Sequence, residues 1–408
     1  MKTIKIDIPT IHEENDLCIV SYSITLEEHG ETKKKRELWY GIPREYQAFI
    51  SSEVADAPVV LLLSYAMRGG YDIECGLPLS DKLYYQVTTQ LMPQLVFSNA
   101  CHFPKITAST VDICWTPREV ATALSCGVDS FTTLHEYTDE NVSEKRRISC
   151  VTFFENGAHH SGHVGHSDRE NMVFNAQLKH IKSYCDANQL KLISITSNLD
   201  EFLTDMFWED SFDNTFTYRN VSFVLLLQKL IRIYYFAPDE IEKDMSFDLN
   251  QSSASYQRFL LASFSTGSTS FLNSNQVLTR IEKIKYISQF PDTYDSLLVC
   301  YCSDRNCGEC IKCRRTLVEM DVAGVLDKYE KSFDLERYRK NRSRFFSWCI
   351  ANRDTSPLLN EIDVYIKENN ISVPKNTYLF AELRRIGEKT GLIYLAYKLS
   401  GKSKKSNV

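Results

Sequence analysis

The chain has 408 residues, of which 43% are hydrophobic and 25% charged, and its formal net charge is −6 at pH 7. This is the composition of a globular protein with a large apolar core, and it excludes collagen-like and low-complexity chains. The acidic balance gives no strong sign of a surface that binds nucleic acids through excess positive charge. A chain of this length predicts two or three domains.

The amino-terminal sequence MKTIKIDIPT lacks the apolar stretch of a secretory signal. No apolar run reaches the roughly 20 residues that a membrane-spanning helix needs. We therefore expect a cytoplasmic protein without membrane association, in which thiols stay reduced. Its thirteen cysteines then need an explanation other than a set of disulfide bonds.

Residues 1–115 begin with alternating apolar and polar positions in Lys2–Ile8 and Cys18–Leu26. An apolar run, Val59–Ala66, and an amphipathic helical pattern near Lys82–Val96 follow. We interpret this segment as an α+β domain. Because it carries no catalytic signature, a role in recognition or docking is its expected function.

The segment after residue 118 has the order strand, small-residue loop and helix. Val120–Leu124 reads as a buried strand, Ser125–Ser130 as the loop, and a helical pattern begins at Phe131. Backbone N–H groups of such a loop and the positive end of the helix dipole can cradle a phosphate. Asp129 would repel that phosphate unless a cation bridges them, so it implies Mg²⁺. The alternative is a turn that caps the helix without a ligand.

The next elements alternate between strands and helices. Arg147–Phe154 and Lys191–Thr196 read as strands, and Glu170–Ala187 and Arg219–Phe236 read as helices. This alternation predicts a parallel sheet with helices on both faces. Ligands of such sheets bind at the carboxyl ends of the strands, where the Ser125 loop would lie.

Two further sets of polar residues are candidates for substrate contacts. The first is a histidine-rich loop, for which a second metal, a substrate or nucleotide contact and a solvent-exposed loop all stay open. Its members are His159, His160, His163 and His166. The second is the pair Arg219 and Asn220, expected at a helix start. Arg219 suits bidentate contact with a phosphate, and the alternative is a capping and salt-bridging pair.

Five cysteines lie within the fourteen residues CYCSDRNCGECIKC. Cys307, Cys310 and Cys313 form C-x2-C-x2-C, and a fourth thiolate nearby would complete a tetrahedral structural zinc site. We favour Cys300 as the fourth ligand because it follows the apolar run Ser296–Val299, read as a strand end, with Cys302 as the substitute. Buried or redox-active thiols and an iron–sulfur cluster are the alternatives.

The same segment predicts two local features. Gly308 follows Cys307 and suits a turn with positive φ. Ile311–Val322 reads as a helix packed behind the metal. Residues 321–408 read as a helical extension that includes Thr377–Glu388.

The loop resembles the PP-loop, S-x-G-x-D-S, of the ATP pyrophosphatases, with Cys126 in place of the commoner glycine. With the cysteine motif, the chain resembles the 7-cyano-7-deazaguanine synthase (QueC-like) family over about Thr116–Met320. The resemblance implies a PP-loop domain between the two flanking segments. It also implies that ATP and its pyrophosphate are bound by Ser125, Cys126, Gly127, Val128, Asp129 and Ser130.

The resemblance implies an ATP-dependent ligase that adenylates the carboxylate of a 7-deazaguanine, 7-carboxy-7-deazaguanine, and passes it to an amine. Asp129, Ser130 and Arg219 would be catalytic, and Arg219, Asn220 and His160 would bind the substrate. The long flanking segments resemble the larger branch found in anti-phage defence operons, where the amine belongs to a partner protein. The alternatives are nitrile synthesis from ammonia, a tRNA-modifying enzyme that uses Cys126 as nucleophile, and an ATP-binding scaffold without activity.

Overall fold

The computed structural model describes residues 2–158, 168–207, 212–238, 246–274, 277–301 and 303–390. The chain forms two compact units. Unit 1 comprises the described residues of Met1–Leu124 and Glu136–Gln276, and unit 2 those of Ser125–His135 and Val277–Val408. Each unit is described by itself below.

Unit 1 is built on one large mixed sheet. Its strands are β1 (Lys2–Ile6), β2 (Thr10–Glu14), β3 (Leu17–Glu28), β4 (Glu31–Pro43), β5 (Asp72–Cys75), β7 (Ile106–Thr107), β9 (Glu119–Ala123), β10 (Cys150–Phe154), β11 (Lys191–Ser197), β12 (Ile231–Phe236) and β13 (Ser270–Asn273). Their order is β13-β12-β9-β10-β11-β4-β3-β1-β5-β7, with β2 paired to β3. The short strands β6 (Leu79–Ser80) and β8 (Thr110–Val111) form a separate pair.

The sheet combines a parallel part with an antiparallel part. The strands β13, β12, β9, β10 and β11 run parallel to one another. The long strands β3 and β4 pair in antiparallel fashion, and β4 joins β11 through Thr196↔Gly41 and Ser197↔Tyr40. The strands contributed by residues 1–115 therefore extend the same sheet, because β11 uses its free edge to pair with β4. The compact units thus divide the chain differently from the three segments expected from the sequence.

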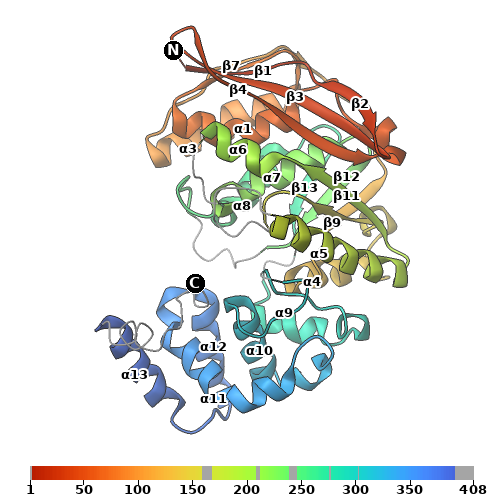
Figure 1. The fold of residues 1–408 in the computed structure, drawn as a ribbon. Coiled ribbons are helices and arrows are strands. Elements are labelled where there is room, and N and C mark those ends of the chain that lie inside the picture. Colours follow the sequence, from red (N-terminus) through yellow and green to blue (C-terminus); the bar gives the residue numbers. More distant parts are fainter. Residues whose placement is uncertain are drawn as a thin grey trace. The chain divides into compact units, whose positions relative to one another are not determined.

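The helices of unit 1 are α1 (Asp56–Gly69), α2 (Asp81–Gln86), α3 (Met92–Asn99), α5 (Asp168–Ala187), α6 (Leu199–Phe207), α7 (Phe212–Leu225) and α8 (Gln257–Phe264). Figure 1 shows α1 and α6 beside the long strands β3 and β4, and α1 packs against α7. Every residue of α1 from Asp56 to Met67 is buried, as expected for a helix that is apolar on all sides. The mixed α/β class with a mostly parallel central sheet flanked by helices agrees with the sequence prediction.

The helix predicted over Arg219–Phe236 is wrong at its start and in its second half. Helix α7 begins at Phe212, so Arg219 and Asn220 lie inside the helix and not at its start. Helix α7 ends at Leu225, and Ile231–Phe236 is the strand β12, which pairs with β9 and β13. Four of the six residues of β12 are buried. Apolar runs of this kind do not distinguish a buried strand from a buried helix by periodicity, and the β-branched and aromatic side chains favoured the strand.

Unit 2 is helical in its described residues. It contains the start of α4 (Val128–Thr138), followed by α9 (Arg280–Ile287), α10 (Ile311–Val322), α11 (Leu335–Ala351), α12 (Pro357–Glu368) and α13 (Thr377–Lys389). The helices predicted over Ile311–Val322 and Thr377–Glu388 are confirmed. In the described part of the chain, no helix has both the length and the apolar character that a bilayer crossing requires.

Candidate functional site

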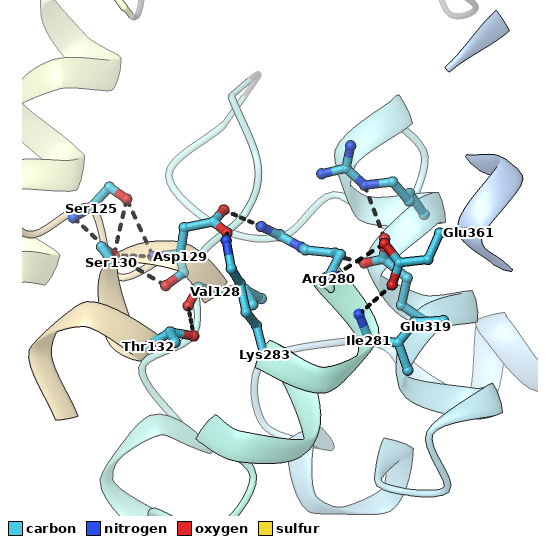
Figure 2. A network of polar contacts seen from close by, with 12 residues as sticks. Ser125, Val128, Asp129, Ser130, Thr132, Arg280, Ile281, Lys283, Glu319 and Glu361 are labelled. Carbon is cyan, nitrogen blue, oxygen red and sulfur yellow. Dashed lines mark hydrogen bonds and ion pairs between the residues drawn. The ribbon is translucent and has the colours of Figure 1, made fainter. Parts of the chain in front are cut away.

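The loop Ser125–Ser130 is a tight turn whose backbone N–H groups converge on one oxygen atom. Gly127 N–H donates to Ser130 Oγ at 3.0 Å, and Ser125 N–H lies 3.4 Å from the same oxygen. The hydroxyl of Ser125 lies 3.2 Å from Ser130 Oγ (Figure 2). The predicted strand β9 precedes this loop in the chain, and α4 begins inside it, at Val128, which is three residues before the helical start predicted at Phe131. The expected order of strand, loop and helix is therefore present, and it brings both predicted serines together.

Cys126 occupies the left-handed region of the backbone map. Its φ is +56° and its side chain is fully buried. The carbonyl of Cys126 accepts a hydrogen bond of 2.8 Å from Leu298 N–H, which fixes this turn to the segment before Cys300. Positive φ favours glycine, because a residue without a Cβ atom adopts it without strain.

We expect Cys126→Gly to fold normally, with a change in the free energy of unfolding within about 1 kcal/mol, because relief of the left-handed backbone offsets the lost side-chain packing. Cys126→Val should be destabilised by at least about 2 kcal/mol, since a β-branched residue resists this conformation. Urea denaturation of both variants measures the difference. Equal loss of stability in the two variants would contradict the backbone explanation.

Asp129 is held by two cations that the sequence analysis missed. Arg280 Nη1 forms an ion pair with Asp129 Oδ2, and Lys283 Nζ donates to Asp129 Oδ1 at 2.8 Å. The side chains of Arg280 and Lys283 are only 8% and 5% exposed. Burial alone would raise the pKa of Asp129, but the charges of Arg280 and Lys283 outweigh burial and hold that pKa well below its usual range. Asp129 is therefore a carboxylate.

Arg280 and Lys283 come from the first turn of α9, which a capping box begins. Thr279 accepts a hydrogen bond from Glu282 N–H at 3.3 Å, and Glu282 accepts one from Thr279 N–H at 2.8 Å. The T-x-x-E pattern in the sequence is a local signal for this helix start. It places residues 280 and 283 one turn apart, so both reach Asp129 from the same helix face.

A second carboxylate lies on the other side of Arg280. Glu319 of α10 is fully buried, 3.6 Å from Arg280 Nε and 3.3 Å from Arg315 Nε. Its carboxylate oxygens have no hydrogen-bond partner among the described residues. Burial raises the pKa of Glu319, and this effect outweighs the positive charges of Arg315 and Arg280, which lower it. The guanidinium of Arg280 thus lies between the carboxylates of Asp129 and Glu319. A third carboxylate, that of Glu361 in α12, accepts hydrogen bonds from the backbone N–H groups of Arg280 at 3.1 Å and Ile281 at 2.8 Å (Figure 2).

Arg219 and Asn220 lie in unit 1, where they hold the loop after β10. Arg219 is 2% exposed, and its guanidinium donates to Asp200 Oδ1 at 2.7 Å, Thr215 Oγ1 at 2.8 Å and the carbonyl of Asn156 at 3.1 Å. Asn220 Oδ1 accepts from the Asn156 side chain at 2.9 Å. These contacts agree with the salt-bridging alternative, and contact of Arg219 or Asn220 with a substrate stays a prediction. His159, His160, His163 and His166 lie outside the described residues.

The four cysteines predicted to bind metal lie together in unit 2. The sulfur atoms of Cys300, Cys307, Cys310 and Cys313 all lie within 4.8 Å of one another. The Cys307–Cys313 and Cys300–Cys310 sulfur pairs are 3.9 and 4.0 Å apart. Tetrahedral zinc with Zn–S bonds of about 2.3 Å places sulfurs roughly 3.8 Å apart, so this set could hold zinc.

The backbone around these cysteines supports thiolate ligands. Cys307 Sγ accepts the N–H groups of Glu309 at 3.4 Å and Cys310 at 3.3 Å, and Cys310 Sγ accepts that of Cys313 at 3.4 Å. Hydrogen bonds from Cys300, Cys310 and Cys313 lower the pKa of Cys307, whereas the mutual hydrogen bonds of the cluster raise the pKa values of Cys310 and Cys313. Gly308 has a φ of +70°, as predicted for this turn.

Cys300 is fixed by a residue that the sequence analysis did not single out. Asn306 Oδ1 accepts the N–H groups of Val299 at 2.8 Å and Cys300 at 3.2 Å, while Asn306 Nδ2 donates to Leu297 O at 2.8 Å. The strand end expected over Ser296–Val299 is wrong, since this segment has no regular secondary structure. The Asn306 side chain supplies the hydrogen bonds that a neighbouring strand would have made. Cys302 lies outside the described residues.

The geometry thus gives two candidate sites in unit 2, the loop with its cations and the cysteine cluster. Comparison of the chain with models of known protein families, with characterised proteins and with solved structures finds no match.

Proposed function

We propose that the protein is a PP-loop ligase that cleaves ATP between the α and β phosphates and adenylates a carboxylate. The observation that carries this proposal is the loop Ser125–Ser130, a turn of converging N–H groups beside two buried cations, Arg280 and Lys283. Converging amides and cations stabilise the charge that grows on a departing pyrophosphate. The left-handed conformation of Cys126 supports the PP-loop resemblance, because it accounts for the glycine usual at that position.

In the proposed reaction, an oxygen of the carboxylate attacks the α-phosphorus and pyrophosphate leaves. An amine then attacks the acyl carbon, AMP leaves and the amine loses a proton, which gives an amide. Mg²⁺, when bound, would neutralise phosphate charge beside Asp129. That carboxylate fits a metal ion only after it releases at least one of its two cationic partners, Arg280 and Lys283.

The resemblance to the QueC-like family supplies the proposed substrate, the carboxylate of a 7-deazaguanine. We propose an amine of a partner protein as the acceptor, with ammonia as the alternative. No contact in the described residues favours either acceptor. The strands of residues 1–115 belong to the main sheet of unit 1. We therefore propose that the exposed surface of unit 1 recognises the partner protein, and that residues 1–115 are not a separate docking module.

The four-cysteine cluster is proposed to hold a structural zinc ion. All four ligands are thiols, and a complete set of four protein ligands leaves no open position for water. Cys310 also precedes α10 directly, so the ion would anchor the helix that carries Glu319.

The ligase proposal is tested by pyrophosphate release from Mg·ATP in the presence of 7-carboxy-7-deazaguanine. We expect Asp129→Ala to lower the rate by about 100-fold or more, in the range found when one electrostatic contact to a transition state is lost. Asp295→Ala is the matched control, because it removes an exposed carboxylate of unit 2 that pairs only with the exposed Lys331 in the described residues.

Equal rates in wild type and Asp129→Ala would reject the ligase proposal and favour a scaffold. Intact-protein mass spectrometry of co-expressed candidate partners distinguishes the acceptors: added mass supports the protein conjugate, and nitrile formed from ammonia supports the biosynthetic alternative.

Activity retained in Cys126→Gly would exclude that thiol as the nucleophile of a tRNA-modifying reaction. The complete burial of Cys126 already weighs against that role.

A further inference from the structure

Helix α13 of unit 2 presents an apolar face to water. Thr377 and Ala381 are buried on the face by which α13 packs against its neighbours, α11 among them (Figure 1). Leu379, Leu383 and Ile386 lie on the opposite face, because their spacing of four and three residues aligns them along one side of a helix. A surface helix normally turns polar and charged side chains to that side. The pattern of α13 is therefore that of a helix covered on both faces.

The three outer side chains form one exposed patch. They are 56%, 55% and 54% exposed, and Phe380 beside them is also exposed. The helix cannot turn this patch inward, because Tyr378 Oη donates to Asp363 Oδ1 at 3.1 Å and Arg385 forms an ion pair with Asp354. Contiguous apolar patches are rare on soluble proteins and mark places where another segment or molecule binds.

The segment that follows α13 in the chain has the composition of a covering layer. Residues 392–399 read LIYLAYKL, in which Lys398 is the one charged residue, and the sequence becomes polar again at GKSKKSNV. Exposure of so many apolar side chains to water is unfavourable. This segment therefore needs an apolar surface as much as the outer face of α13 needs a cover.

The end of α13 is suited to bring the two together. The helix ends at Lys389, and Gly391 follows two positions later, where glycine commonly reverses the chain in a left-handed conformation. In such an ending the next residue, here Leu392, contacts an apolar side chain of the last helical turn, here Ile386. From Ile386 back to Leu379 is about 10 Å at 1.5 Å per residue, which eight residues can cover even as a helix.

We propose that residues 392–399 fold back onto the outer face of α13 and cover Leu379, Leu383 and Ile386. The direct connection favours this occupant over a second copy or another protein. A segment joined by a short linker is present at an effective concentration of about 1 mM, far above that of a separate protein in dilute solution. The inference goes beyond the proposed function and does not depend on it.

The test is limited trypsin digestion of the full-length protein, followed by mass measurement over time. Lys398 lies inside the proposed contact and Lys402 beyond it. In the wild type we expect cleavage after Lys398 to be at least about tenfold slower than after Lys402, because a protease cuts a packed segment only when it opens.

Two variants examine the contact from its two sides. Leu383→Asp should abolish the protection of Lys398, because it places a charge in an apolar contact. Leu395→Asp should do the same with α13 unchanged, so a folding defect of the helix cannot produce that result. Val277→Asp is the matched control, since it adds the same charge at an exposed apolar position of unit 2 outside α13, and it should leave Lys398 protected.

Equal cleavage after Lys398 and Lys402 in the wild type overturns the proposal. Protection that survives both Leu383→Asp and Leu395→Asp also overturns it, because other contacts then order the segment. Light scattering identifies a different occupant: a wild-type dimer that Leu383→Asp converts to a monomer means that a second copy covers α13. A wild-type monomer whose protection is lost in both variants and kept in Val277→Asp supports the fold-back.

Discussion

Replacing Cys313 with serine is expected to abolish metal binding by the four-cysteine cluster and to unfold unit 2. Cys313 is fully buried in the first turn of α10 and lies 3.9 Å from Cys307 through their sulfur atoms. Structural zinc sites contribute about 10 kcal/mol or more of apparent binding free energy to folding. Loss of one ligand should therefore cost more than about 5 kcal/mol, which is comparable to the whole stability of an ordinary domain.

Elemental analysis and thermal unfolding measure the two effects in the same samples. Cys349→Ser is the matched control, because Cys349 is equally buried in α11 of unit 2 but lies outside the cluster. It should keep its metal and lose only about 1–3 kcal/mol for burying a hydroxyl group. If Cys313→Ser keeps both its metal and its melting temperature, the cluster is not a metal site. Iron in the wild-type protein would point to the iron–sulfur alternative.

Gly157→Ala is expected to destabilise unit 1 by about 3–5 kcal/mol, which is the effect of breaking a buried ion pair. Gly157 has a φ of +92°, and a Cβ atom there would lie 2.5 Å from Arg219 Nη1 and 2.5 Å from Asp200 Oδ1. These are the two atoms of the ion pair that fixes the loop after β10. The added methyl group must separate them or displace the loop.

Gly70→Ala separates this clash from the cost of the backbone conformation. Gly70 also belongs to unit 1 and has a φ of +74°, but a Cβ atom there would have no neighbour within 4 Å. Its substitution should therefore cost only about 1–2 kcal/mol, the ordinary penalty of a left-handed residue. Urea denaturation followed by tryptophan fluorescence compares the two variants. Similar losses in both would mean that Arg219 and Asp200 yield to the methyl group at little cost.

Local pattern was enough to predict the features that depend on residues close in sequence. The helix Ile311–Val322, the positive φ of Gly308 and the gathering of Cys307, Cys310 and Cys313 all follow from spacings of a few residues. Cys300 joins them from seven residues before Cys307, although the strand used to justify the preference for it is absent. The choice between Cys300 and Cys302 stays a prediction, because Cys302 lies outside the described residues.

Features that depend on distant residues were beyond such patterns. Lys283 meets Asp129 across 154 positions of the chain, and nothing in the sequence around either residue specifies the other. The pairing of β4 with β11 joins residues of the amino-terminal segment to a strand more than 150 positions later, so the sequence alone could not show that both segments share a sheet. The strand β12 was misread for a different reason, because its burial on both faces erases the alternation that identifies a strand.

The discontinuous composition of unit 2 has a consequence at the ribosome. Residues 125–135 emerge early, but Arg280, which binds Asp129, is 151 positions further along. The ring of His135 stacks on that of Phe290 with centroids 3.9 Å apart, and this contact likewise cannot form until Phe290 has been synthesised. At about 5–20 residues per second, translation leaves the nascent turn and its helix without these contacts for roughly 8–30 s. A fragment that starts at residue 277 would never acquire them, so unit 2 cannot be produced as a contiguous piece of this polypeptide.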